Sequence, residues 1–378
     1  GGAGLFYDKL VLAFPAVAAV TSGTRIGLTA PQGYTYELTE ESVEQFLEEF
    51  GYDEFRAVLE DGLLFPEELV LRFSTDTRLD TPYTVQYNLG LERALGTRAA
   101  FRVNAVRTLG YHLARMRDLN PVVALDPPCA DENGNIDPTD LTCVGIPVHR
   151  DPTVGSIAAI TTSGRSWYSA LETGLSWRGP STWAQLSYTW SKTLDTGPDP
   201  LKGGIYLPAN SDDLLAEKGR SDHDRRHRVV LSGEGSLPWW NLRASVVAQY
   251  MTGAPFNVTT GLDENRDGIN TDRPVGVGRN TGAETSLDAI NEIRVEEGLE
   301  PVGSLEEPDF LQVDVRLTKA FLADAGRWSG EAYLQVFNLL DRYNAGPIEG
   351  RITSSSFGRP VGYIGPPRTI ELGLRFGF

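Results

Sequence analysis

The side chains with the clearest spacing for chemistry are Asp263, Asn265 and Asp267, which alternate along the chain and are followed directly by a glycine. Alternating carboxylate and amide oxygens before a glycine turn are typical of calcium loops. The EF-hand pattern is incomplete, because Pro274 stands where a glutamate is expected and no helices flank the loop. A calcium ion would therefore also need Asp272, a backbone carbonyl or water. The alternative is a loop of Asx turns whose carboxylates face the solvent.

Motifs for catalysis are missing from the sequence. There is no Gly-x-Ser-x-Gly elbow, His-Glu-x-x-His pair, phosphate loop or Cys-x-x-Cys pair. Gly276 and Gly278 lie in a long polar segment, without the strand and helix that a dinucleotide site requires. His223 and His227 would lie about 13 Å apart in a strand, too far to share one metal ion, so we interpret them as part of a charged cluster at a strand entry. We therefore expect no enzyme activity and no cofactor other than a structural calcium ion.

The composition and the charge favour a protein of many strands. The chain has 378 residues with 40 Gly, 15 Phe, 14 Tyr and 7 Trp, but only 2 Met and 2 Cys, a mixture that suits strands and turns. The net charge of −17, with lysine and arginine scattered singly, argues against nucleic acid as a partner. No apolar run reaches the roughly 18 residues of a transmembrane helix, which leaves a β-barrel as the way to span a membrane.

The elements that must position these residues are strands, because apolar and polar residues alternate with a period of two. At the C-terminus, Ile370, Leu372 and Leu374 fall on one face of a strand, and Glu371 and Arg375 fall on the other. The same alternation recurs at 83–92, 101–105, 167–177, 184–190, 229–231, 242–250, 311–318 and 332–336. With residues 4–8, we count about ten strands of roughly 9–11 residues, the length that crosses a bilayer when tilted.

The connections between these strands are alternately short and long. Tight turns are expected at 95–98, 178–181, 237–241 and 323–326, and long polar segments at 9–80, 113–164, 196–222, 254–308 and 341–367. Outer-membrane barrels have short periplasmic turns and long extracellular loops, whereas a sandwich seldom needs so many long loops on one edge. The prediction is an all-β, transmembrane, antiparallel up-and-down β-barrel. The alternative is a β-sandwich whose aromatic residues fill a core between two sheets.

Several stretches carry a further likeness through their order and spacing, although each alone is weakly specific. They are GRSWYSALET at 164–173, LSYTWSKTLD at 186–195, DRRHRVVLS at 224–232, DENRDGINTDRP at 263–274, FNLLD at 337–341 and the terminal Phe378. From about residue 81 onward, the sequence resembles TonB-dependent outer-membrane receptors, in particular the Oar-like branch. The resemblance implies a plugged barrel that closes with about 22 strands. Residues 1–378 would then be the C-terminal part of the barrel domain, without the plug and the N-terminal strands.

The resemblance also implies a location in the cell outer membrane and a role in transport. Such a receptor binds a scarce ligand outside the cell and passes it inward by TonB-linked gating. The implied partners are outer-membrane lipid, an unidentified extracellular ligand, the TonB complex through the missing plug portion, and the barrel-insertion machinery, which would read Phe378. The alternative is a surface adhesion or assembly protein whose loops bind a partner without transport, and an enzyme among the loops ranks last.

An outer-membrane barrel would give two further sets of residues a role. Six charged residues of the predicted strands would face the lumen, where they could pair with a plug or line a permeation path: Arg228, Glu234, Asp314, Arg316, Glu371 and Arg375. Cys129 and Cys143 enclose an acidic loop, and an oxidising compartment would join them in a disulfide. A loop of this length would gain about 3 kcal/mol from such a bond.

Two long segments are expected to be extracellular loops. Segment 9–80 is strongly acidic, and helical spacing of apolar residues predicts one or two short helices between Thr39 and Leu64. We interpret it as a solvated surface loop, and the alternative is a lid that contacts cationic or metal-bearing ligands. Segment 254–308 is the loop that contains the calcium-like motif.

Overall fold

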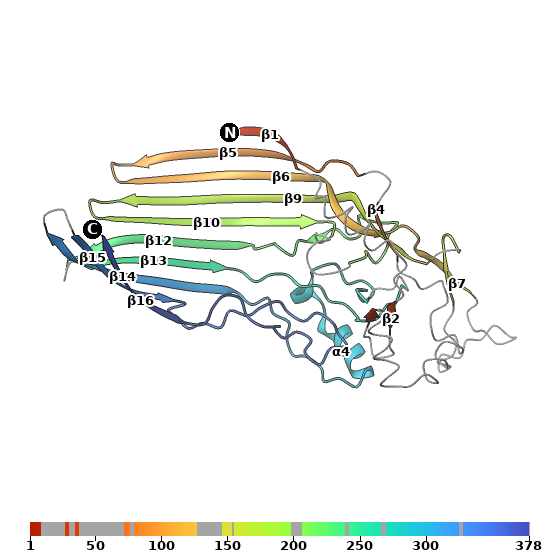
Figure 1. Ribbon diagram of the computed structural model, residues 1–378. Coiled ribbons are helices and arrows are strands. Elements are labelled where there is room, and N and C mark those ends of the chain that lie inside the picture. The colour runs from red at the N-terminus through yellow and green to blue at the C-terminus, as the bar shows by residue number, and fades with distance from the viewer. Residues whose placement is uncertain are drawn as a thin grey trace.

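The computed structural model describes residues 1–8, 27–29, 35–37, 72–75, 79–126, 146–152, 155–197, 206–238, 242–265, 270–324 and 328–377. Its main element is an antiparallel sheet in which ten strands neighbour one another in chain order (Figure 1). These strands are β1 (Gly2–Tyr7), β5 (Tyr83–Leu95), β6 (Ala99–Asp118), β9 (Ile157–Arg178), β10 (Thr182–Asp195), β12 (His227–Leu237), β13 (Leu242–Met251), β14 (Phe310–Asp324), β15 (Trp328–Phe337) and β16 (Thr369–Gly377).

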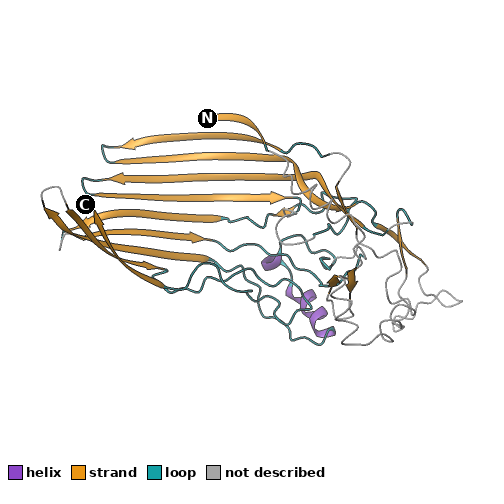
Figure 2. Ribbon diagram, in the orientation of Figure 1, coloured by secondary structure: helices purple, strands orange, loops and turns teal. Residues whose placement is uncertain are grey.

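Smaller elements accompany this sheet. They are β4 (Arg72–Thr75), which pairs in parallel with β9, β11 (Gly219–Arg220), which pairs with β10, the hairpin of β2 (Gly27–Thr29) and β3 (Thr35–Glu37), and the hairpin of β7 (Val122–Asp126) and β8 (Ile146–His149). The helices η2 (Gly282–Glu284) and α4 (Leu287–Glu296) lie at one end of the sheet (Figure 2). No described helix has the length and apolar content that a bilayer-spanning helix needs.

The predicted all-β, up-and-down order of about ten strands is confirmed. Four short turns join β5 to β6, β9 to β10, β12 to β13 and β14 to β15, at the positions expected from the sequence. At the first of these turns Gly96 has a φ of 73°, a left-handed conformation that glycine adopts at little cost. The described long connections gather at the opposite end of the sheet, which we call the long-loop end (Figure 1).

The cross-strand register sorts the strand side chains onto two faces. Arg316 lies opposite Gln335, and Gln335 lies opposite Glu371, so these residues share what we call the polar face. The other face is apolar and exposed: Leu89 is 72% exposed and Leu372 is 77% exposed. A sandwich would bury these leucines between two sheets, so the sandwich alternative is wrong.

The described hydrophobic core lies at the long-loop end, where a small cluster joins Met116 of β6 and Ile160 of β9 to Leu207, and a larger cluster is built from the connections. Its largest cluster consists of Phe256, Val258, Ile290, Ile352 and Phe357, and we call it the loop core. It joins the connection between β13 and β14 to the connection between β15 and β16, with α4 packed between them through Ile290. The sheet therefore presents at one end a compact set of loops with an interior of its own.

The helix α4, which we did not predict, follows local rules for a helix. Asp288 in its first turn and Arg294 in its last turn both complement the helix dipole. Beyond its end, Gly298 has a φ of 71°, and the amide of Leu299 donates to the carbonyl of Arg294 at 2.7 Å. A left-handed glycine is the usual way to end a helix. The sequence therefore contained the signals that begin and end this helix, but they extend over only about ten residues.

Candidate functional site

A pocket of about 560 Å³ lies at the long-loop end. Its lining includes Met251 and Phe310, which face each other across β13 and β14 on the polar face. The remaining lining comes from three long connections, represented by Tyr206, Asn257 and Ile348. A molecule bound in this pocket would therefore contact several loops and the polar face of the sheet together.

The polar lining of the pocket includes a half-buried arginine, Arg225. Arg225 donates hydrogen bonds to the backbone carbonyls of Asp222 at 3.2 Å and Asp224 at 3.0 Å. Burial lowers the pKa of Arg225 below its usual value, although the charge of Asp224 opposes this shift. In the described ranges, no carboxylate lies within ion-pair distance of its guanidinium. The pocket therefore offers a cationic group to a polar or anionic part of a ligand.

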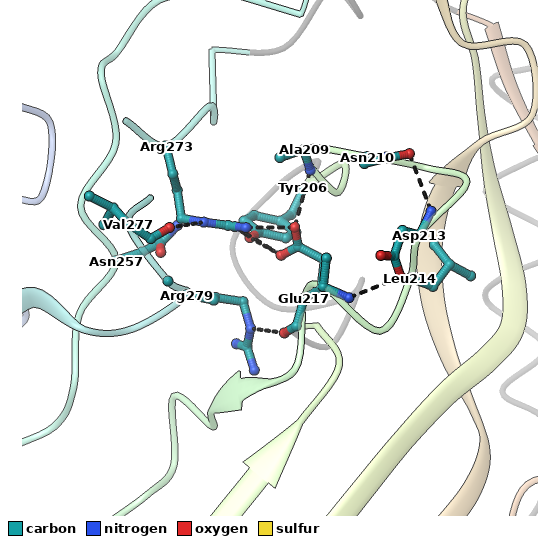
Figure 3. Close-up of polar contacts among 12 residues, drawn as sticks. Tyr206, Ala209, Asn210, Asp213, Leu214, Glu217, Asn257, Arg273, Val277 and Arg279 are labelled. Carbon is teal, nitrogen blue, oxygen red and sulfur yellow. Dashed lines mark hydrogen bonds and ion pairs between the residues drawn. The ribbon is translucent and has the colours of Figure 1, made fainter. Parts of the chain in front are cut away.

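Beside the pocket, a buried carboxylate joins two of the long connections (Figure 3). Glu217 accepts two hydrogen bonds from the guanidinium of Arg273, at 2.7 and 2.8 Å. It also accepts one from the hydroxyl of Tyr206 at 3.0 Å and one from the backbone amide of Ala209 at 3.2 Å. The side chains of Glu217 and Arg273 are only 1% and 8% exposed. Such a bidentate and fully satisfied pair specifies one arrangement of the two loops.

The ionisation of this cluster follows from its contacts. Burial alone would raise the pKa of Glu217, but the hydrogen bonds and charge of Arg273, with the bonds from Tyr206 and Ala209, outweigh it and hold that pKa below its ordinary value. Burial and the charge of Glu217 both raise the pKa of Tyr206. The cluster is therefore an ionised carboxylate and a guanidinium with a neutral phenol, and nothing in it is poised for proton transfer near neutral pH.

A second arginine ties the same loops to the sheet. Arg279 donates from Nε to the backbone carbonyl of Glu217 at 3.0 Å (Figure 3). Its Nη2 contacts the carboxylate of Asp195 at the end of β10. Close by, Arg220 pairs with Asp224 at 3.0 Å and with Glu307 at 2.8 Å. Buried charges thus hold the connections that surround the pocket.

The structure describes three of the four predicted calcium ligands. Asp263, Asn265 and Asp272 are described, and Asp267 lies outside the described residues. One carboxylate oxygen of Asp272 accepts the backbone amides of Glu264 at 2.7 Å and Asn265 at 2.9 Å, so it closes the turn itself. Among the described residues, no group of three His, Cys, Asp or Glu side chains is suited to a metal ion. Calcium binding at this loop remains a prediction.

The six predicted lumen charges all lie on the polar face: Arg228, Glu234, Asp314, Arg316, Glu371 and Arg375. Two of them, Arg316 and Glu371, belong to one network, in which Arg316 pairs with Glu331 at 3.3 Å and lies over the ring of Tyr333 at 3.9 Å. The hydroxyl of Tyr333 donates to Glu371 at 2.8 Å. Their role as lumen-lining charges remains a prediction.

Several predicted features fall outside the described residues. These are Cys129 and Cys143, the helices expected between Thr39 and Leu64, and the terminal Phe378. His223 and His227, which we did not interpret as a metal pair, make separate contacts. His223 lines the pocket, and the ring of His227 forms a hydrogen bond with the hydroxyl of Tyr188 at 2.9 Å.

The sequence analysis missed the Glu217 and Arg273 pair and the pocket beside it. The two residues are 56 positions apart, and neither belongs to a repeating pattern. Arg273 does fall within the 263–274 stretch that we used for the family resemblance. No local signal identifies its partner, because the contact depends on how two long connections fold against each other.

The chain belongs to the outer membrane beta barrel domain family, whose model matches residues 1–371. The predicted outer-membrane location is therefore confirmed. The resemblance to an outer-membrane receptor is confirmed for the barrel domain. No curated protein sequence matches the chain.

Solved structures of similar fold are outer-membrane transporters and receptors at low identity. The outer membrane transporter YddB from Escherichia coli is 12% identical over 80% of this chain and 34% of its own, with a TM-score of 0.47. The FrpB iron transporter from Neisseria meningitidis is 13% identical over 80% and 32%, with a TM-score of 0.40. The ferripyoverdine receptor of Pseudomonas aeruginosa is 16% identical over 79% and 27%, also with a TM-score of 0.40. The chain thus spans about a third of the length of these proteins.

Proposed function

We propose that this chain forms part of the barrel wall and the ligand-contacting loops of an outer-membrane transporter that takes up a ligand from outside the cell. The observation that carries the proposal is the position of the pocket, which is bounded by long loops and by Met251 and Phe310 on the polar face of the sheet. In an outer-membrane barrel the long loops are extracellular and the polar face lines the interior. A ligand in this pocket would lie at the outer mouth of the barrel.

The way the loops are held supports a binding role. Burying charge is costly, and a buried ion pair is retained where it fixes one geometry. Here Glu217, Arg273 and Arg279 hold two connections against the sheet beside the pocket. Loops fixed before binding lose less conformational freedom when a ligand arrives. The guanidinium of Arg225, which has no carboxylate within ion-pair distance among the described residues, favours a ligand with a carboxylate, phosphate or other polar acceptor.

The proposal includes energy coupling by TonB, which the resemblance to Oar-like receptors implies. A plug and a coupling segment would have to come from outside this chain, and the whole transport cycle belongs to the protein that contains it. Recognition of Phe378 by the insertion machinery and a structural calcium ion at Asp263, Asn265, Asp267 and Asp272 belong to the same proposal. The proposal assigns no catalysis to the chain.

The test is uptake by cells in which the native gene carries a pocket-filling substitution. Growth is measured at limiting concentrations of defined ferric siderophores, oligosaccharides and peptides, in strains with and without TonB. For the nutrient that the deletion strain cannot use, we expect Ala254→Trp to lower uptake by at least roughly tenfold, or ~1.4 kcal/mol. Ala254 lines the pocket.

The matched control places the same side chain on the loop surface. Val275 is 100% exposed and lies outside this pocket, so Val275→Trp should leave uptake within about twofold of wild type. Uptake that survives Ala254→Trp, or that does not need TonB, contradicts the proposal. A deletion strain that loses only surface attachment would instead support the adhesion alternative.

A further inference from the structure

The apolar face of the sheet carries basic residues but almost no acidic ones. Seven acidic strand residues lie on the polar face: Glu92, Glu172, Asp195, Glu234, Asp314, Glu331 and Glu371. Among the strand residues whose side chains the structure describes, up to the register shift that follows Gly110 in β6, the apolar face carries Arg93, Arg107, Lys192 and Lys319 and no acid. In a chain of net charge −17, so one-sided a distribution does not follow from composition.

Two of these basic residues lie in one row. The register places Tyr87 opposite Arg107, Arg107 opposite Ser169, and Ser169 opposite Lys192, across β5, β6, β9 and β10. Both basic side chains are exposed. Arg107 donates from Nη1 to the hydroxyl of Ser169, which uses one of its five N–H donors. The other donors point out from a face that meets lipid, where water is scarce and an unpaired charge is costly.

The depth of this row can be estimated from the strands. Arg107 lies eight residues above Ala99, where β6 leaves its short turn. At 3.3 Å per residue and a tilt of roughly 40°, this corresponds to about 20 Å of membrane depth. The apolar band of such barrels is about 25 Å tall, so Arg107 lies near its upper edge. A long basic side chain at this level reaches the headgroups by extending along the wall.

An aromatic row marks the same boundary. Tyr7, Tyr83 and Tyr111 lie opposite one another on β1, β5 and β6, above the row of Arg107. The ring centroids are 5.8 Å apart for Tyr7 and Tyr83 and 5.1 Å apart for Tyr83 and Tyr111. Tyrosines concentrate where headgroups meet hydrocarbon. The row of Arg107 and Lys192 therefore lies just inside the outer headgroup layer.

We propose that Arg107 and Lys192, with the hydroxyls of Tyr87 and Ser169 beside them, bind a phosphate group of lipid A on the outer wall of the barrel. In an outer-membrane barrel the long-loop end faces outward, and the lipid of that leaflet is lipopolysaccharide, whose lipid A carries phosphates at the hydrocarbon boundary. Within the part of the chain that the structure describes, Arg107 and Lys192 form no ion pair with a carboxylate, and such guanidinium and ammonium groups complement an anion. The proposal does not depend on transport, since it concerns only the wall that faces lipid.

The test measures binding of purified lipid A to the protein that contains this chain, extracted in detergent, by native mass spectrometry. Removing both phosphates from lipid A should lower its affinity for the wild-type protein by at least roughly tenfold, or ~1.4 kcal/mol. The double variant Arg107→Gln and Lys192→Gln should show a similar loss for intact lipid A. The matched control, Arg93→Gln and Lys319→Gln, removes the two basic residues near the short turns and should bind as wild type.

Three results would overturn the proposal: equal affinity for lipid A and its dephosphorylated form, an equal loss in the control variant, or equal affinity for phosphatidylglycerol. The last would show attraction to any anionic lipid. The measurement on the wild-type protein needs no variant, so equal affinity for the two lipids overturns the proposal even where Arg107→Gln prevents insertion. The exchange Arg107→Lys with Lys192→Arg keeps both charges and should retain binding, and its failure to bind would also contradict the proposal.

Discussion

The apolar face of the sheet exposes its apolar side chains, whereas the loop core buries them. Leu89 and Leu372 on the sheet are 72% and 77% exposed, whereas Phe357 and Ile352 in the loop core are 1% and 0% exposed. The strands meet lipid, which takes the place of an apolar interior. The loops must exclude water from an interior that they build themselves. The stability of the two regions therefore rests on different interactions.

Their charges differ in the same way. On the polar face, Arg316 and Glu331 are 36% and 32% exposed, as expected of a pair beside water. At the long-loop end, Arg273 and Glu217 are 8% and 1% exposed. Exposed pairs contribute little to stability, whereas a buried pair costs several kcal/mol when one partner is lost. Substitutions that remove one partner of a buried pair or of an exposed pair test this comparison.

The largest effect is expected for Glu217→Gln. Glutamine keeps the shape of the side chain but leaves the guanidinium of Arg273 buried without its carboxylate, which costs about 3–5 kcal/mol. We expect this substitution to lower the free energy of local opening of the loops. Hydrogen exchange of the backbone amides in 206–226 and 270–308 measures that free energy. Amides of the strands should keep their protection.

The control for this substitution is a more exposed ion pair in the connection between β15 and β16, at the same end of the sheet. Arg351 pairs with Glu349 at 3.0 Å, and its side chain is 60% exposed. Arg351→Gln should therefore change the free energy of opening by no more than ~1 kcal/mol. Equal losses in both variants would mean that the Glu217 pair is no more important than a surface pair, and the comparison would fail.

The second effect concerns the sheet, where adjacent residues of β5 face opposite ways. Leu89→Arg puts a charge on the face that meets lipid and should destabilise the barrel by ~2–4 kcal/mol, depending on depth. Asn88→Arg puts the same charge one residue earlier, on the polar face, and should cost less than about 0.5 kcal/mol. Urea unfolding of the protein in phospholipid vesicles measures both.

A similar loss in Leu89→Arg and Asn88→Arg would show that the two faces meet similar surroundings. That outcome would contradict the assignment of Leu89 to lipid, and with it the inference about Arg107 on the same face. A loss that grows from the ends of the strands toward their centre would support the assignment, because the cost of a charge depends on its depth.

The sheet could be predicted from the sequence because each strand repeats one local rule. Ile370, Leu372 and Leu374 alternate with Glu371 and Arg375, and the same period recurs in every strand that we expected. Short and long connections then alternate, which fixes the order of the strands. The alternating pattern was sufficient to predict the strands of the barrel wall and the face of the sheet on which each side chain lies.

The site could not be predicted in the same way. The contact of Glu217 with Arg273 joins residues that no local pattern relates, and the pocket appears only where three connections meet. The calcium-like spacing is a local signal, but it does not show that Asp272 accepts the backbone amides of Glu264 and Asn265. Irregular loops depend on long-range packing, and a single sequence does not display it.

The third effect is a dependence on pH that should be confined to the loops. The contacts of Arg273 hold the pKa of Glu217 below its ordinary value of 4.5. The ionised pair therefore contributes its full stability above the pKa of the unfolded chain, and this contribution is lost as pH falls through the lower folded value. Each unit of depression corresponds to about 1.4 kcal/mol. Protection of the loop amides should fall with acid in wild type and much less in Glu217→Gln.

The smallest effect tests whether α4 ends by the same rules as a helix in a water-soluble domain. Gly298 has a φ of 71°, and an added Cβ atom would meet nothing within 4 Å. Gly298→Ala should therefore cost only the strain of a left-handed alanine, about 1 kcal/mol. Gly303, in the same connection, is equally open around its Cβ position and has no positive φ, so Gly303→Ala should be neutral or stabilise by up to about 1 kcal/mol. Hydrogen exchange of the amides in 287–299 measures both, and equal values for the two variants would mean that the end of α4 is held by packing in the loop core and not by its glycine.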